Sequence, residues 1–181
     1  VRVNSTFKKY STMANSRGLT GRSCAEAVLR SAGITDVRVE PVSGSLTDHY
    51  DPKAKVIRLS DSVYNSNSVS ALGVAAHEAG HAVQHNVGYF PIRIRQAIIP
   101  ICQIGSNLAM PLILLGLVVS IAGLAELGLI LFSLSALFQL VTLPVEFNAS
   151  RRAIDYLEQG ASLTLDEMRG AKRVLRAAAM T

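Results

Sequence analysis

An apolar stretch from Gln96 to Val145 constrains this chain more than any other feature. Glu126 is the only charged residue within it, and no Lys or Arg occurs between Arg95 and Arg151. One membrane-spanning helix needs about 20 apolar residues, so the stretch is about twice as long as one span. Helices in a soluble core rarely lack polar residues on every face. The sequence therefore predicts a helical hairpin that crosses a membrane twice, and two buried core helices are the alternative.

The turn of this hairpin is expected at residues 123–128 (GLAELG), which contain the single charge and two glycines. This places the first span at residues 101–122 and the second at residues 127–143. Pro111 should kink the first span, because proline lacks the backbone N–H that a helix interior needs.

The charge pattern supports a membrane orientation. Lys and Arg total 18 and the net charge is +5. Twelve of these residues precede the apolar stretch and six follow it. They form no basic patch interleaved with aromatic residues, so a nucleic-acid partner is not expected. Positive charge on both flanks predicts that both flanks face the cytoplasm. The expected partner is therefore the lipid bilayer, and the oligomeric state stays open.

The flanking segments predict an α+β fold that is mainly helical, with a small β-sheet. Alternating residues at 37–39 and 55–60 indicate strands. Periodic apolar residues indicate a helix from Ser68 or Ser70 to about residue 86, another continuing from residue 146 to about 159, and a last one at 166–178. We expect three segments: residues 1–96 with the first part of a catalytic domain, the hairpin at 97–145, and residues 146–181 with the rest of that domain.

The helix that begins near Ser68 carries an H-E-x-x-H motif, His77-Glu78-Ala79-Gly80-His81. Residues four apart project from one face of a helix, so both imidazoles can bind one Zn²⁺. Zinc lowers the pKa of a bound water and polarises a scissile carbonyl, and the intervening glutamate accepts the water proton and passes it to the leaving amine. The small residues between the ligands let another backbone pack closely. The motif predicts zinc-dependent hydrolysis with Glu78 as general base.

A catalytic zinc needs a third protein ligand. His85 is too distant, since it lies about 80° around the helix and about 12 Å along it from His77. The metzincin class is excluded because Val87 stands where that class has its third histidine. Glu146 is the better ligand, as the first charged residue after the apolar stretch. Spacing alone does not distinguish this role from a carboxylate that marks the membrane surface.

Four segments together resemble the YugP-type neutral zinc metallopeptidases of bacterial membranes. They are residues 15–21 (NSRGLTG), 46–52 (LTDHYDP), 76–82 (AHEAGHA) and 143–153 (LPVEFNASRRA). The resemblance implies an integral, multi-pass peptidase of the bacterial inner membrane that acts on peptides or proteins, with membrane proteins among the possible substrates. It also implies a further membrane helix before the part given, in agreement with a first residue that is not Met.

More distantly, the chain is similar to the gluzincin class that includes the membrane protease HtpX. That resemblance implies a minigluzincin-like zincin core in which Glu146 binds zinc, through a pattern Glu-x-x-Ala-Asp. Ser150 stands where the class has Asp, so the carboxylate that would orient a zinc-bound histidine is missing or comes from Asp155 or Asn148. In such folds a strand before the motif helix binds the peptide as an added strand, and residues 55–60 are the expected strand.

Three further residues, His49, Tyr50 and Tyr156, are candidates for stabilising the oxyanion of a transition state, with a structural role as the alternative for each. The competing function is a membrane scaffold or partner-binding protein with structural zinc and no turnover, which Ser150 in place of Asp would favour.

Overall fold

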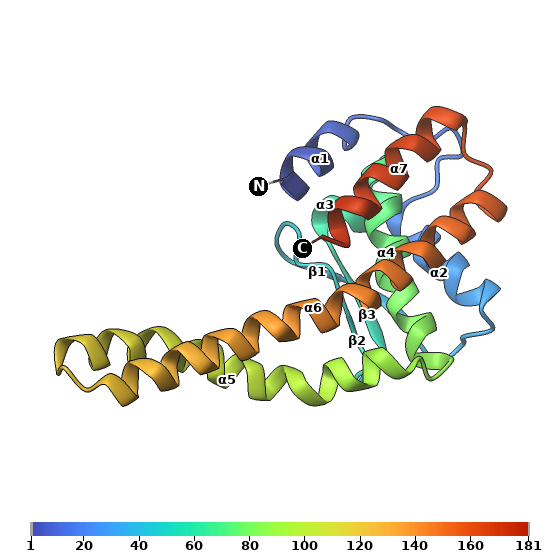
Figure 1. Cartoon of the computed structure of the whole chain (residues 1–181). Coiled ribbons are helices and arrows are strands. Elements are labelled where there is room, and N and C mark those ends of the chain that lie inside the picture. The colour runs from blue at the N-terminus through green and yellow to red at the C-terminus, as the bar shows by residue number, and fades with distance from the viewer. Residues whose placement is uncertain (1, 181) are drawn as a thin grey trace. The chain divides into compact units, whose positions relative to one another are not determined.

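A computed structural model describes residues 2–180. It divides into two compact units: the first comprises the residues before Tyr89 together with those from Glu146 onward, and the second is Tyr89–Val145. The chain is mainly helical with a small three-stranded sheet, as predicted. In order, the elements are α1 (Arg2–Tyr10), α2 (Gly21–Ser31), β1 (Arg38–Val42), β2 (His49–Asp51), β3 (Val56–Ser60), α3 (Asp61–Tyr64), α4 (Val69–Asn86), α5 (Phe90–Val118), α6 (Ala122–Gln159) and α7 (Leu165–Ala178) (Figure 1).

Hydroxyl side chains begin three helices of the first unit. Thr20 and Thr164 each accept a hydrogen bond from the third residue of the helix that follows, and the third residue returns a bond to the cap. Ser68 accepts from the backbone N–H of Ala71 at the start of α4. These caps satisfy donors that the first helical turn leaves unpaired. The Ser68 cap confirms the predicted start of the motif helix.

The sheet has the strand order β1-β3-β2, with β1 parallel and β2 antiparallel to β3. The expectation that residues 55–60 bind a peptide along an open edge is therefore wrong. Lys55 precedes the strand at a positive φ of 50°, and β3 is central, with β1 paired along its whole length and β2 along Val56 to Arg58. Its side chains alternate little, since four of its five residues are buried.

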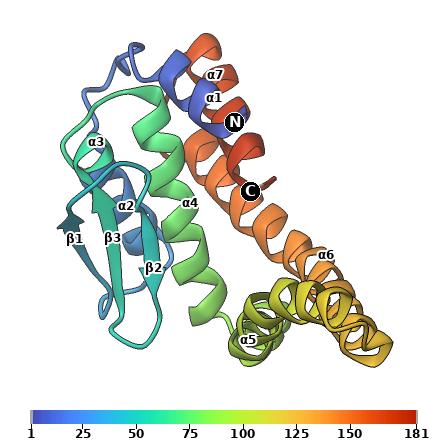
Figure 2. The same ribbon diagram turned by 90° about the vertical axis from the view of Figure 1, so that its left-hand side faces the viewer.

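Helix α4 is the centre of the first unit. It lies between the sheet with α2 and the pair formed by α7 and the later part of α6 (Figure 2). Its apolar residues Leu72, Ala75 and Ala79 have no exposed surface. Small residues allow close contacts on the α6 and α7 side, where a Cβ added at Gly80 would lie 2.7 Å from the carbonyl oxygen of Ala149. The motif helix is therefore buried on both sides.

The segment at residues 15–21 ties the N-terminal part to the start of α4. Buried Asn15 donates to the carbonyl oxygens of Leu19 (2.7 Å) and Asn67 (2.5 Å) and accepts from the backbone N–H of Leu19 (3.0 Å). An added Cβ at Gly21 would meet the carbonyl oxygen of Val63 at 2.3 Å. These contacts give the segment at residues 15–21 a structural role.

The second unit is a hairpin of apolar helices. By length and composition, both α5 and α6 could cross a membrane. In the most apolar 18-residue stretch of each helix, only 17% (α5) and 6% (α6) of the residues are buried. The apolar surface therefore faces outward, unlike that of soluble core helices. Within the pair, the hydroxyl of Ser106 donates to that of Ser135 (2.6 Å), a polar contact suited to helix packing in lipid.

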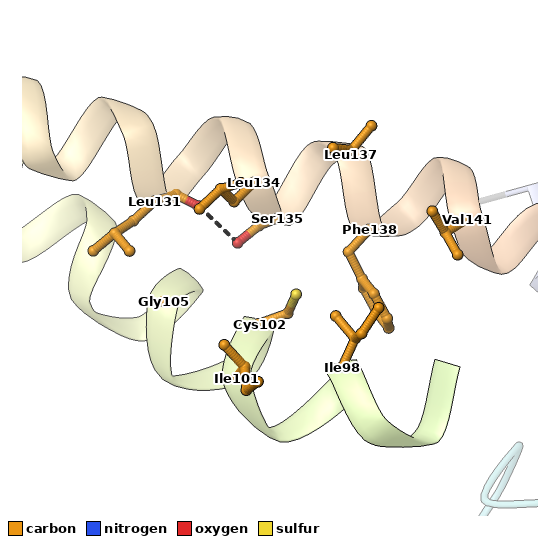
Figure 3. Close-up of a pocket in the computed structure, with 10 residues that line it drawn as sticks. All are labelled: Ile98, Ile101, Cys102, Gly105, Leu131, Leu134, Ser135, Leu137, Phe138 and Val141. Carbon is orange, nitrogen blue, oxygen red and sulfur yellow. Dashed lines mark hydrogen bonds between the residues drawn. The ribbon is translucent and has the colours of Figure 1, made fainter. Parts of the chain in front are cut away.

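The turn of the hairpin lies earlier than residues 123–128. It falls between Val118 and Ala122, with Ser120 at a positive φ of 56°. Residues 123–128 are helical, and Gly128 serves close packing, since an added Cβ would lie 2.7 Å from the carbonyl oxygen of Ala109. A pocket of about 290 Å³ lies farther along the pair, where apolar residues such as Phe138 surround Cys102 and Ser135 (Figure 3).

Candidate metal centre

Helix α4 presents two histidines on one face, one turn apart. The ring centroids of His77 and His81 are 4.7 Å apart, with the rings edge to face at 80°. The residues are 5% and 8% exposed. Buried imidazoles need partners for both nitrogens, so the neighbours of these rings determine what the pair can bind.

The third member of the cluster comes from α6. One oxygen of Glu146, Oε2, lies 3.1 Å from Nε2 of His77 and 3.5 Å from Nε2 of His81. The ligand atoms of the three side chains all lie within 4.8 Å of one another. The close approach of Gly80 to Ala149 brings α6 near enough for this contact. The glycine in the motif therefore has the packing role that the sequence suggested.

Ser150 occupies the place where the gluzincin pattern has an aspartate. Its Oγ lies 3.1 Å from Nδ1 of His77 and donates to the backbone carbonyl of Leu175 in α7 (3.2 Å). Because a hydroxyl has one hydrogen, Oγ must accept from Nδ1–H. The serine thus orients His77 with Nε2 toward Glu146, and in the neutral ring this nitrogen carries the lone pair. Neither Asp155 nor Asn148 is needed for that histidine.

His81 has a different support. Its Nδ1 lies 3.0 Å from Oε1 of Gln84, whose Nε2 donates to Oδ1 of Asn148 (3.0 Å). Gln84 has no exposed surface. The amide oxygen accepts from Nδ1–H, so Nε2 of His81 also presents a lone pair toward Glu146.

The charges of the cluster stabilise one another. Burial alone would raise the pKa of the Glu146 carboxyl. When the two histidines are protonated, however, their Nε2–H groups donate to this carboxylate, and these bonds and charges outweigh burial and hold its pKa well below its usual range. Burial would likewise lower the pKa of His81, yet the hydrogen bond to Glu146 and the charges of Glu78 and Glu146 raise it. The carboxylate is therefore ionised and the pocket attracts positive charge.

The three ligand side chains, His77, His81 and Glu146, fit a zinc ion. Two imidazole lone pairs and a carboxylate converge, and such a group is stable only with a cation, either a proton or a metal ion, among its members. Tetrahedral zinc with bonds of about 2.1 Å separates its ligand atoms by about 3.4 Å, and the two distances to Glu146 bracket this value. Two nitrogens with one carboxylate oxygen also form the ligand set of catalytic zinc sites.

Glu78 lies beside this cluster, half-buried on α4. Its charge contributes to the raised pKa of His81. It also adds to the raised pKa of Asp48, for which burial is the main cause. The Asp48 carboxylate accepts from the backbone N–H of Ser60 (2.7 Å) and from its hydroxyl. A loop residue of the 46–52 segment thus lies within electrostatic range of Glu78.

His49 lies outside the group of metal-ligating side chains that the described residues form. Nε2 of exposed His49 accepts from the guanidinium of Arg58 (3.3 Å), which has only hydrogens to offer, so Nδ1 donates to the carbonyl of Thr47 (2.8 Å). Both nitrogens of His49 are engaged. Tyr50 contacts His85 edge to face, with ring centroids 5.7 Å apart.

Asp155 and Tyr156 lie on other parts of α6. Asp155 is exposed, and Tyr156 packs against the hydrophobic core. Burial raises the pKa of Tyr156, with a smaller contribution from the charge of Cys24. Asn148 does contribute, but through Gln84. The sequence reasoning missed Gln84, and its position seven residues after His77 on the same helix face was the available signal.

Comparison with known proteins also points to zinc. Residues 1–181 match the family described as "Putative neutral zinc metallopeptidase". The chain is 46% identical over 180 residues to the "Putative membrane protease YugP" of Bacillus subtilis (strain 168), an alignment that covers 99% of this chain and 80% of that protein. No solved structure matches the chain.

Proposed function

Because this chain belongs to the family of "putative neutral zinc metallopeptidases", we propose that it is a membrane-embedded, zinc-dependent endopeptidase. In this proposal His77, His81 and Glu146 hold the metal and Glu78 is the general base. The observation that carries it is the convergence of two oriented imidazole nitrogens and one carboxylate oxygen within 4.8 Å. The sheet, α4 and α6 would form a zincin core of the minigluzincin kind.

Zinc, when bound, supplies a Lewis acid that makes a water more acidic and a peptide carbonyl more electrophilic. A carboxylate oxygen of Glu78 accepts a proton from the water whose oxygen attacks the carbonyl carbon. Glu78 then gives this proton to the amide nitrogen as the C–N bond breaks, so that one product leaves as an amine and the other as a carboxylic acid. Ser150 and Gln84 hold the two imidazoles in the tautomer that leaves Nε2 without a hydrogen throughout.

Glu78→Gln tests the proposal. The amide cannot accept the proton, so cleavage of casein or a generic peptide should fall by about 10²- to 10⁴-fold. Zinc content, measured by atomic absorption, should remain near one ion per chain because the three ligands are intact. The matched control is Glu26→Gln, the same change at a half-exposed residue of α2 that lies outside the metal cluster, which should leave both measurements unchanged.

An active Glu78→Gln protein would refute the role of Glu78. A wild-type protein that binds zinc tightly and cleaves nothing would support the scaffold alternative. The scaffold alternative was based on Ser150 standing where the class pattern has an aspartate. This argument is now weaker, because the Ser150 hydroxyl contacts Nδ1 of His77 in place of that carboxylate.

We further propose that the hairpin spans the bilayer twice with the metal centre on the cytoplasmic side. The basis is the excess of Lys and Arg on both flanks of the apolar stretch. An added protease should then digest the flanks in inverted membrane vesicles and spare them in intact spheroplasts. Digestion in spheroplasts would place the centre on the other side.

A further inference from the structure

We propose that Arg152 is a positioning residue that sets the tautomer of His81 through two side-chain amides. The relay runs from Arg152 to Asn148 to Gln84 to His81. It rests on the proposed function only in naming zinc as the ion, since the hydrogen-bond directions themselves follow from side-chain chemistry.

The relay begins with a group that can only donate. Nε of Arg152 lies 2.9 Å from Oδ1 of Asn148, four residues earlier on α6. A guanidinium has five N–H groups and no acceptor, and it keeps its charge in proteins. The Asn148 amide must therefore turn its oxygen toward Arg152, because the opposite orientation would place two donors against each other.

This orientation determines the next amide. Oδ1 of Asn148, which is fixed as an acceptor, also lies 3.0 Å from the Gln84 side chain. Gln84 must present Nε2 to it, and its Oε1 then faces His81 at 3.0 Å. Gln84 is fully buried, so a reversed amide would lose these bonds without water to replace them.

The last step concerns the imidazole. Facing an acceptor, Nδ1 of His81 carries the hydrogen, and Nε2 keeps its lone pair 3.5 Å from Glu146. Two rows of α6 thus support the two histidines. Glu146 and Ser150 form the row at His77, while Asn148 and Arg152 form the row that reaches His81.

Loss of Arg152 would release this constraint. Asn148 could then reverse, Gln84 could reverse with it, and the Gln84 Nε2–H would face His81. The ring would move its hydrogen to Nε2, where it competes with the metal. Loss of such outer partners typically costs 10- to 100-fold in metal affinity.

The experiment uses the full chain in detergent with ¹⁵N-labelled histidine. Nitrogen NMR of the metal-free protein at alkaline pH, where imidazoles are neutral, reports which nitrogen of His81 carries the hydrogen. Zinc affinity is measured by competition with a chelating dye. The variants are Arg152→Met, which removes the donor, Arg152→Lys, which restores one, and Arg151→Met, the same loss of charge at the exposed neighbouring residue.

We expect the hydrogen on Nδ1 of His81 in the wild type, in Arg151→Met and in Arg152→Lys. Arg152→Met should shift it to Nε2 and weaken zinc binding by about 10- to 100-fold. If Arg152→Met fails to fold, Asn148→Leu interrupts the same relay at its next member and should give the same two results.

A variant that breaks the relay yet keeps the wild-type tautomer and zinc affinity would overturn the proposal, as would a wild-type His81 with its hydrogen on Nε2. The peptidase proposal is tested separately. A wild type that has the expected tautomer and binds zinc but cleaves no peptide would leave the relay standing and remove the enzyme.

Discussion

Replacing Gly80 by Ala tests whether the close approach of α4 and α6 sets the geometry of the metal centre. The added Cβ would lie 2.7 Å from the carbonyl oxygen of Ala149, against 3.4 Å for ordinary contact, so about 0.7 Å (3.4 − 2.7) must be gained by movement. The obstacle is helix backbone, which cannot rotate away. One helix must therefore shift. The contact that forces the shift joins Gly80 and Ala149, which are the sequence neighbours of His81 and Ser150.

The expected effect on stability is small. Overpacking costs about 1–3 kcal/mol, and Ala in place of Gly within a helix returns about 1 kcal/mol. The free energy of unfolding should thus fall by about 0–2 kcal/mol. Ligand distances in metal sites hold to about 0.2 Å, so the centre is far more sensitive, and misplacement near 1 Å costs about 10²-fold in activity.

Gly73→Ala is the matched control on the same helix. Its added Cβ meets Cγ1 and Cβ of Val174 in α7 at 3.1 and 3.3 Å, a milder contact than the 2.7 Å approach at Gly80, and it faces α7 rather than the ligand-bearing helix α6. Thermal unfolding and zinc competition with a dye are measured for both variants. We expect Gly80→Ala to remain folded and lose at least about tenfold in zinc affinity. Equal affinity in the two variants would refute the idea that the helix contact positions Glu146.

Two further predictions concern the first unit. The Glu167 carboxylate accepts from the backbone N–H groups of Ser16 and Thr164, and although burial raises its pKa, these bonds lower it below the unfolded value. Its stabilisation is therefore complete above the unfolded pKa and is lost as pH falls through the folded pKa. In chemical denaturation, Glu167→Gln should cost stability at neutral pH and progressively less in acid, and a cost independent of pH would contradict this. Burial raises the pKa of the Cys24 thiol to about 12, so a thiol reagent should label Cys24 far more slowly in the native than in the denatured protein; fast native labelling would argue against the buried position.

Local signals predicted much of the fold. The Ser68 cap and the terminal Asn86 bound the motif helix as expected, and Thr164 begins the last helix. These features depend on neighbouring residues, so they are readable along the chain. Strand β2 was missed because it has three residues and forms only by pairing with β3. The hairpin turn was misplaced because the glycines expected to form it lie within α6, where Gly128 packs closely against α5.

By itself, the sequence determined that two imidazoles share a helix face and that an apolar hairpin separates them from Glu146, since helical period and hydropathy are local properties. The tertiary structure alone decided that Glu146, 69 residues after His77, reaches the imidazole. It also decided that Ser150 and Gln84 orient the two rings. Such contacts depend on how closely two helices pack, and here that distance is set by the missing side chain of Gly80 against the backbone of α6.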